Sequence, residues 1–123
     1  MQRAILAATT LLAFGFSLLT ALPAHAEYGA LAWDRETGKY GVSWQQPSAK
    51  RAAEVALSEC GTSGCKVIKP IGPAMCGALA TSADGKQAGA AERKNRDAAR
   101  LAALASCPKK SGECVARVTD CNK

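Results

Sequence analysis

The segment YGALAWDRETGKYGVSW, residues 28–44, sets the architecture of this chain, because much of its pattern returns in CGALATSADGKQAGAA, residues 76–91. Both copies contain Gly-Ala-Leu-Ala, at 29–32 and at 77–80, and both have a glycine in the turn that follows. Self-similarity of this kind indicates that one structural unit has been used twice. We therefore expect two internal repeats, spanning residues 28–69 and 76–121.

Each repeat predicts two strands, a helix and a third strand. The turn dipeptides Thr-Gly and Asp-Gly supply the positive φ that tight turns need, so each copy begins with a β-hairpin. Ser48 and Asn95 are good N-caps for the helices that follow. Small residues and leucine then form one helical stripe in each copy, namely Ala52, Ala56, Leu57 and Cys60, and Ala99, Ala103, Leu104 and Cys107. With third strands at 66–68 and 115–118, we expect an α+β fold with one mostly antiparallel sheet and both helices on one face.

Residues 1–26 have the three-part layout of a secretory signal. Arg3 precedes a long apolar run, which ends at Pro23 and the small-residue triplet Ala24-His25-Ala26. We expect cleavage after Ala26, which leaves a single domain over residues 27–123 without a membrane span, exported to the periplasm or secreted. An uncleaved membrane anchor is the alternative interpretation of the apolar run.

Loss of the leader also removes the chain's single histidine, His25. Imidazole is the commonest general base near neutral pH and a frequent zinc ligand. We therefore expect no metal site, no cofactor and no enzymatic activity. A histidine-independent hydrolase remains a third possibility, because Ser-Lys pairs and paired carboxylates can act without imidazole.

All six cysteines lie beyond the first hairpin, in a chain short enough to need cross-links. The repeat matches Cys60 with Cys107 and Cys65 with Cys114. It therefore favours disulfides between Cys60 and Cys65, between Cys107 and Cys114, and between Cys76 and Cys121. A metal cluster is the alternative, but the close C-x2-C pairs of common zinc sites do not occur.

All four aromatic residues after the leader fall in the first hairpin, at Tyr28, Trp33, Tyr40 and Trp44. Tyr40, Val42 and Trp44 share one strand face, and their expected counterparts in the second copy are Gln87, Gly89 and Ala91. One interpretation is an aromatic patch that binds a peptide, glycan or protein partner. The other, which we favour, is that these side chains form core.

Basic residues cluster at the start of the second helix, at Arg93, Lys94, Arg96 and Arg100. The whole chain carries 16 Lys and Arg against 10 Asp and Glu, so it is basic. Such a cluster can contact phosphate, anionic lipid or acidic glycan. It contains no aromatic residue, and Glu92 and Asp97 dilute it, so a solvated helix face is the favoured interpretation and no specific nucleic-acid binding is expected.

The combination of Gly29-Ala-Leu-Ala-Trp33, the helix that ends at Cys60-Gly61, and Cys76-Gly-Ala-Leu-Ala80 resembles a family of small secreted bacterial proteins, domain of unknown function 4189. The resemblance covers nearly all of residues 27–123. It implies export and a disulfide-linked α+β domain, and it brings no activity, substrate or catalytic residue. The alanines and glycine at 88–91 depart from the family pattern, which has glycines and aromatics in the second hairpin as well.

These features favour an exported, non-catalytic module that binds a protein or a component of the cell envelope. The alternative is a structural or stress-related envelope protein whose basic face contacts anionic polymers. Both hypotheses rest on a rigid, cross-linked scaffold without an evident catalytic group.

Overall fold

The computed structural model describes residue 15 and residues 26–123. The chain forms, in order, β1 (Tyr28–Trp33), β2 (Tyr40–Gln46), α1 (Ala49–Cys60), β3 (Lys66–Ile71), β4 (Cys76–Ser82), β5 (Ala88–Arg93), α2 (Arg96–Ser106) and β6 (Cys114–Cys121). The expected leader lies almost entirely outside the described residues, and its cleavage stays a prediction. Within the described part, no helix has the length and apolar composition needed to cross a membrane.

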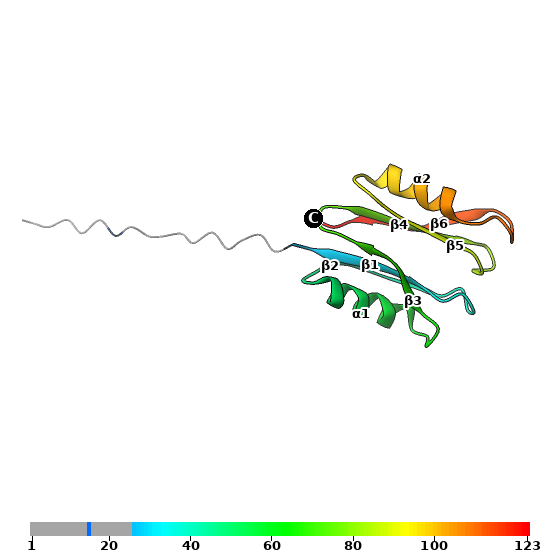
Figure 1. Ribbon diagram of the computed structural model, residues 1–123, viewed down its shortest axis with the longest axis horizontal. Coiled ribbons are helices and arrows are strands. Elements are labelled where there is room, and N and C mark those ends of the chain that lie inside the picture. The colour runs from blue at the N-terminus through cyan, green and yellow to red at the C-terminus, as the bar shows by residue number, and fades with distance from the viewer. Residues whose placement is uncertain (1–14, 16–25) are drawn as a thin grey trace, which may run out of the picture.

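Each repeat builds its own three-stranded antiparallel sheet. The strand order is β2-β1-β3 in the first sheet and β5-β4-β6 in the second. Figure 1 shows the two sheets facing each other, with α1 on the outer side of one and α2 on the outer side of the other. The predicted α+β class and the two strand-strand-helix-strand repeats are confirmed.

The arrangement departs from the expected single sheet with both helices on one face. In the central strand β1, Ala30 and Ala32 pack in the cluster beneath α1. Leu31, between them, packs instead with Leu79 and Ile71 in a cluster that joins the two sheets. A strand that is covered on both faces has apolar residues at successive positions rather than at alternate ones. Two sheets form because each central strand has two apolar faces, one for its helix and one for the opposite sheet.

The helices begin where the caps predict. Ser48 Oγ accepts a hydrogen bond from the backbone N–H of Arg51 at 3.0 Å, and Asn95 Oδ1 accepts one from Ala98 at 2.8 Å. Both bonds satisfy amides of the first turn that have no partner within the helix. The sequence therefore located both helix starts.

The helices lie very close to their sheets. A Cβ atom added to Gly41 of β2 would lie 2.1 Å from the carbonyl oxygen of Ala56 in α1. The buried stripe of α1 is narrow, with Ala52, Ala56 and Cys60 each four residues apart. Leu57, which was expected on this stripe, is 37% exposed because it lies about 100° around the helix from Ala56.

At one end of the molecule the two hairpin turns touch. Gly38 and Gly85 have φ values of 75° and 74°, as the turn dipeptides predict. A Cβ atom added to Gly85 would lie 2.5 Å from the Cα atom of Gly38, so any side chain there would separate the turns. The indole N–H of Trp33 also donates to the Gly85 carbonyl at 2.9 Å, which joins the two sheets at this end.

At the opposite end the C-terminal Asn122 joins the sheets. Its side-chain oxygen accepts from the N–H of Gln45 at 2.9 Å, and its side-chain nitrogen donates to the carbonyl of Gly72 at 2.9 Å. Asn122 is only 5% exposed, and its polar atoms are fully used there.

The disulfides follow the pairing that the repeat favoured. Cys60 is bonded to Cys65, Cys107 to Cys114, and Cys76 to Cys121. No free cysteine is present in the described part of the chain. The two short loops each fix a helix end to the strand that follows, and the long one connects neighbouring strands β4 and β6.

Candidate functional site

The four aromatic side chains of the first hairpin do not form one patch. Tyr28 packs against the cluster beneath α1, on the face of β1 that carries Ala30 and Ala32. Trp44 is half-buried between the sheets and contacts the positions of Gly29 and Gly77. Tyr40 is 39% exposed, and Trp33 is half-buried at the turn end. Trp44 is therefore a core residue. Trp33 and Tyr40 line different hollows of the surface.

The residues of β5 that correspond to those of β2 differ by one position from the expected ones. Trp33 pairs with Tyr40 in the first sheet, and Thr81 pairs with Ala88 in the second. Tyr40, Val42 and Trp44 thus correspond to Ala88, Ala90 and Glu92, and not to Gln87, Gly89 and Ala91. The expected counterparts followed the turn glycines Gly38 and Gly85, which lie 47 positions apart, whereas the paired strands match at an offset of 48. A shift of one residue moves every side chain to the other face of a strand.

The corrected register explains the aromatic asymmetry as packing. Val42 and Trp44 of β2 and Ala88 and Ala90 of β5 all border the cluster between the sheets. Large side chains on one sheet and small ones on the other fill that layer together. The small residues on β5 leave space beside it, where β3 and β5 form one side of the molecule.

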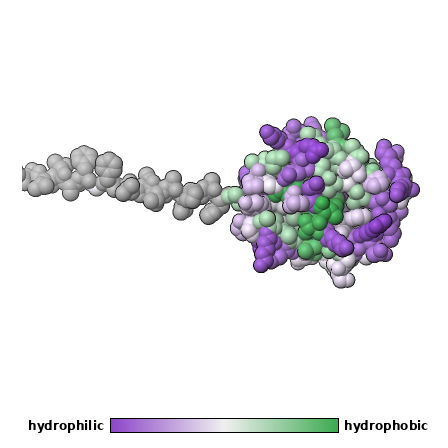
Figure 2. All heavy atoms as spheres, in the orientation of Figure 1, coloured by the Kyte–Doolittle hydropathy of each residue, from purple (hydrophilic) through white to green (hydrophobic). Residues whose placement is uncertain are grey.

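Two hollows lie on this side, and we call them together the β3–β5 groove. They have volumes of about 420 Å³ and about 270 Å³, and Trp33 and Ile68 line both. The first hollow is further lined by Asp34, Arg35, Glu36, Gly64 and Lys66, and the second by Lys69, Ala88, Gly89, Ala90 and Ser106. Figure 2 shows apolar side chains gathered over β3, with hydrophilic residues around them.

The cations of the groove are not in ion pairs. Ion pairs in the described residues join Arg51 to Glu54, Arg96 to Asp120, and Lys109 to Glu113, so Arg35, Lys66 and Lys69 take no part in them. Sequence reasoning singled out Trp33 but missed Ile68 and these three basic residues. The available signal was the strand sequence KVIKPI, which contains two lysines and two isoleucines, and it could not reveal the alanines of β5 that lie beside it.

The carboxylate of Asp34 is hydrogen-bonded inside the β1–β2 turn, so its negative charge is not free to interact with a ligand in the groove. Asp34 is 2% exposed and accepts hydrogen bonds from the hydroxyls of Thr62 and Thr37 and from the N–H of Glu36. The Thr62 hydroxyl first, then the Glu36 amide and the Thr37 hydroxyl, lower the pKa of Asp34 to about 2. This residue fixes the β1–β2 turn to the loop after α1, and its role is structural.

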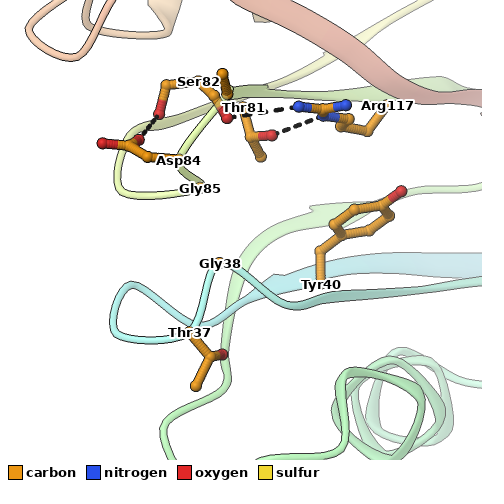
Figure 3. A pocket seen from close by; sticks show the side chains of 9 residues that line it. Thr37, Gly38, Tyr40, Thr81, Ser82, Asp84, Gly85 and Arg117 are labelled. Carbon is orange, nitrogen blue, oxygen red and sulfur yellow. Dashed lines mark hydrogen bonds between the residues drawn. The ribbon is translucent and has the colours of Figure 1, made fainter.

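A smaller polar notch of about 190 Å³ lies on the opposite side of the touching turns. Figure 3 shows Tyr40 and Arg117 on opposite walls of this notch, with Asp84 beyond Gly85. The Nε–H of Arg117 donates to the Thr81 hydroxyl at 2.8 Å, so the guanidinium is oriented along its own sheet. The Ser82 hydroxyl, followed by the Lys86 amide, lowers the pKa of Asp84. Much of the hydrogen-bonding capacity of the polar side chains in this notch is therefore used by other groups of the second repeat.

The basic cluster predicted at the start of the second helix is exposed at all four positions, Arg93, Lys94, Arg96 and Arg100. Arg96 is paired with Asp120 at 2.9 Å. Arg93, Lys94 and Arg100 have no ion-pair partner in the described residues. The structure thus places three cations without ion pairs near the start of α2, and none of the hollows described above lies beside them.

Several serine hydroxyls that could serve a hydrolase are engaged in the fold. Ser43 donates to the carbonyl of Ala52 at 2.6 Å, and Ser82 donates to Asp84 at 2.7 Å. No hydrogen bond among residues 26–123 joins a serine hydroxyl to a lysine amine. The same residues contain no group of three His, Cys, Asp or Glu side chains placed to hold a metal ion.

Comparison with solved structures gives a match in Mycobacterium tuberculosis. The NMR structure of Rv1813c from that organism superposes with a TM-score of 0.55 and 26% sequence identity, and the match covers 99% of both chains. This relative shares the fold described above.

Sequence comparison gives matches among mycobacterial proteins. The chain is 37% identical over 68 residues to a protein named "Uncharacterized protein Rv1813c" of M. tuberculosis, which is 55% of this chain and 46% of that protein. It is 37% identical over 62 residues to "Protein Rv1269c" of the same organism, which is 50% of this chain and 48% of that protein. The chain thus spans about half the length of the curated relatives that it matches. The model of a family described as "Domain of unknown function (DUF4189)" matches residues 28–121, and the chain belongs to this family.

Proposed function

We propose that this chain is an exported, non-catalytic module that binds a protein or a cell-envelope component through the β3–β5 groove. The observation that carries the proposal is the pair of hollows that share Trp33 and Ile68. Apolar concave surface with a few charged groups at its margin is the usual form of a binding site. The groove is also the larger of the two hollowed regions described above.

The cross-links support a site of action outside the cytoplasm. All three disulfides would be reduced by cytosolic thiols, whereas they persist in the periplasm or outside the cell. This agrees with the secretory layout of residues 1–26.

The hydrogen bonds that the polar side chains already make within the fold support a binding role over a catalytic one. Asp34 and Asp84 have lowered pKa values because they accept hydrogen bonds as carboxylates, which makes them poor proton donors near neutral pH. The charged side chains that remain free around the groove are those of Arg35, Lys66 and Lys69, with Glu36 as the single free acid among the described lining residues, and this excess of cations suits recognition of an anionic partner.

Affinity capture from envelope extracts tests the proposal. The oxidised chain is immobilised, and Lys66→Glu with Lys69→Glu is compared with the matched variant Lys109→Glu with Lys110→Glu, which makes the same change of charge away from the groove. The groove variant should lose the captured component and the control should keep it. Equal capture by both variants would exclude the groove as the binding surface.

A further inference from the structure

We propose that the β3–β5 groove takes an extended, acidic segment of a partner protein, which adds to a free strand edge and places alternate apolar side chains in the two hollows. This inference rests on the proposed function and names the class of ligand.

The first support is the state of the strand edges. Each sheet has two edge strands, so the molecule has four edges in all, at β2, β3, β5 and β6. On β2 the N–H of Val42 donates to the Glu59 carboxylate at 3.4 Å, and on β6 the Thr119 carbonyl accepts from Arg96 at 3.4 Å. No comparable side-chain bond in the described residues reaches the backbone of 66–70 or 88–91. Apart from Pro70, which has no N–H to donate, the backbone groups that point outward there are thus available to a further strand, as in β-strand addition.

The second support is that the two hollows are neighbours. Trp33 and Ile68 line both of them. Side chains on one face of an extended peptide recur at every second residue, about 6.8 Å apart. Two neighbouring hollows that share lining residues suit the side chains at positions i and i+2 of such a peptide. The opening beside Ala88 and Ala90 exists because β5 has methyl groups where β2 has Tyr40 and Val42.

The third support is charge. Arg35, Lys66 and Lys69 line the groove without ion-pair partners, and the carboxylate of Asp34 is already satisfied in its turn. Glu36 is the one acidic lining residue that remains free of a side-chain bond in the described residues. The excess of unpaired cations favours an acidic segment over a basic one.

A protein segment suits this lining better than a neutral glycan. Sugar recognition uses an open aromatic face with several planar polar side chains beside it, whereas Trp33 is half-buried and its N–H is already bonded to Gly85. Neither hollow is lined by asparagine or glutamine, and of the planar polar groups in the first hollow the Asp34 carboxylate is already hydrogen-bonded within its turn. We therefore expect a peptide rather than a glycan, and the experiment includes a result that would indicate a glycan.

The test uses two synthetic eight-residue peptides with blocked ends, one alternating Leu with Glu and the other alternating Leu with Lys. Each is titrated into the isotopically labelled, oxidised chain while backbone amide shifts are followed by NMR. The acidic peptide should perturb amides of β3 and β5 saturably, with affinity that falls as salt is raised, and the basic peptide should not. Lys66→Gln with Lys69→Gln should weaken binding about five-fold, and Lys109→Gln with Lys110→Gln should leave it unchanged.

Three results would overturn the inference: no saturable shift with the acidic peptide, equal binding of both peptides, or shifts confined to the start of α2. Protease treatment of the envelope extract separates this inference from the proposed function. Capture that survives proteolysis yet still requires Lys66 and Lys69 would mean that the groove binds a glycan or another non-protein component. The proposed function would then stand, and the inference of a peptide ligand would fall.

Discussion

Removal of the disulfide between Cys76 and Cys121 should cost more stability than removal of either of the other two. Its sequence separation is 45 residues, against 5 for Cys60–Cys65 and 7 for Cys107–Cys114. In the chain-entropy model, closure of the long loop contributes about 4 kcal/mol and closure of each short loop about 2 kcal/mol. The three buried cysteines, at positions 60, 76 and 107, are exposed by only 3%, 4% and 3%, so the loss of packing is similar at each site.

The experiment compares three double Cys→Ala variants by guanidinium unfolding, followed by tryptophan fluorescence. The two short-loop variants serve as matched controls for each other, because they occupy equivalent places in the two repeats. The variant without Cys76 and Cys121 should lose about 2 kcal/mol more of the free energy of unfolding than either control. Equal losses in all three variants, or the largest loss at a short loop, would refute the loop-closure argument.

Three further outcomes are expected. Trp44→Ala should lower the free energy of unfolding by about 3 kcal/mol in urea titrations, because the indole packs between the sheets. An unchanged free energy of unfolding would show that the indole is not part of the core. The pKa of Asp34 lies at about 2, below its ordinary value. The stability that this carboxylate provides is therefore present above about pH 4 and lost as the pH falls toward 2, and Asp34→Asn should flatten that part of the pH profile of unfolding. Arg100→Gln and Lys110→Gln should shift elution from a sulfated resin equally if the basic cluster is only a solvated face, and a larger shift for Arg100 would indicate a polyanion site.

Much of the fold could be predicted because its signals are local or repeated. Ser48 and Asn95 start helices through contacts within a few residues, and the matched cysteine positions narrow the disulfide pairing. The number of sheets was missed although a signal for it was present. Ala30, Leu31 and Ala32 are apolar in succession, and this pattern requires cover on both faces of a strand.

The candidate site was harder to predict, because it depends on how the two repeats meet. Trp33 was identified as a candidate, but its indole lines a groove only because Ile68 and the alanines of β5 lie beside it. Those neighbours come from distant parts of the chain. The true counterparts of Tyr40 and Trp44 were missed because the turn glycines Gly38 and Gly85 were taken as equivalent. Their offset is one residue smaller than that of the paired strands, so matching them places the β2 side chains opposite the wrong face of β5.

The contact between the two repeats is made by equivalent surfaces, since Leu31 of one unit meets Leu79 of the other. Surfaces related in this way are what two-fold homodimers use to associate. A single repeat released from the chain would expose its share of this layer, in which the large side chains of β2 are complemented by the small ones of β5. The short connection from Ile71 to Cys76 makes this pairing intramolecular. The folded molecule is consequently comparable to a tethered dimer, whose assembly does not weaken on dilution.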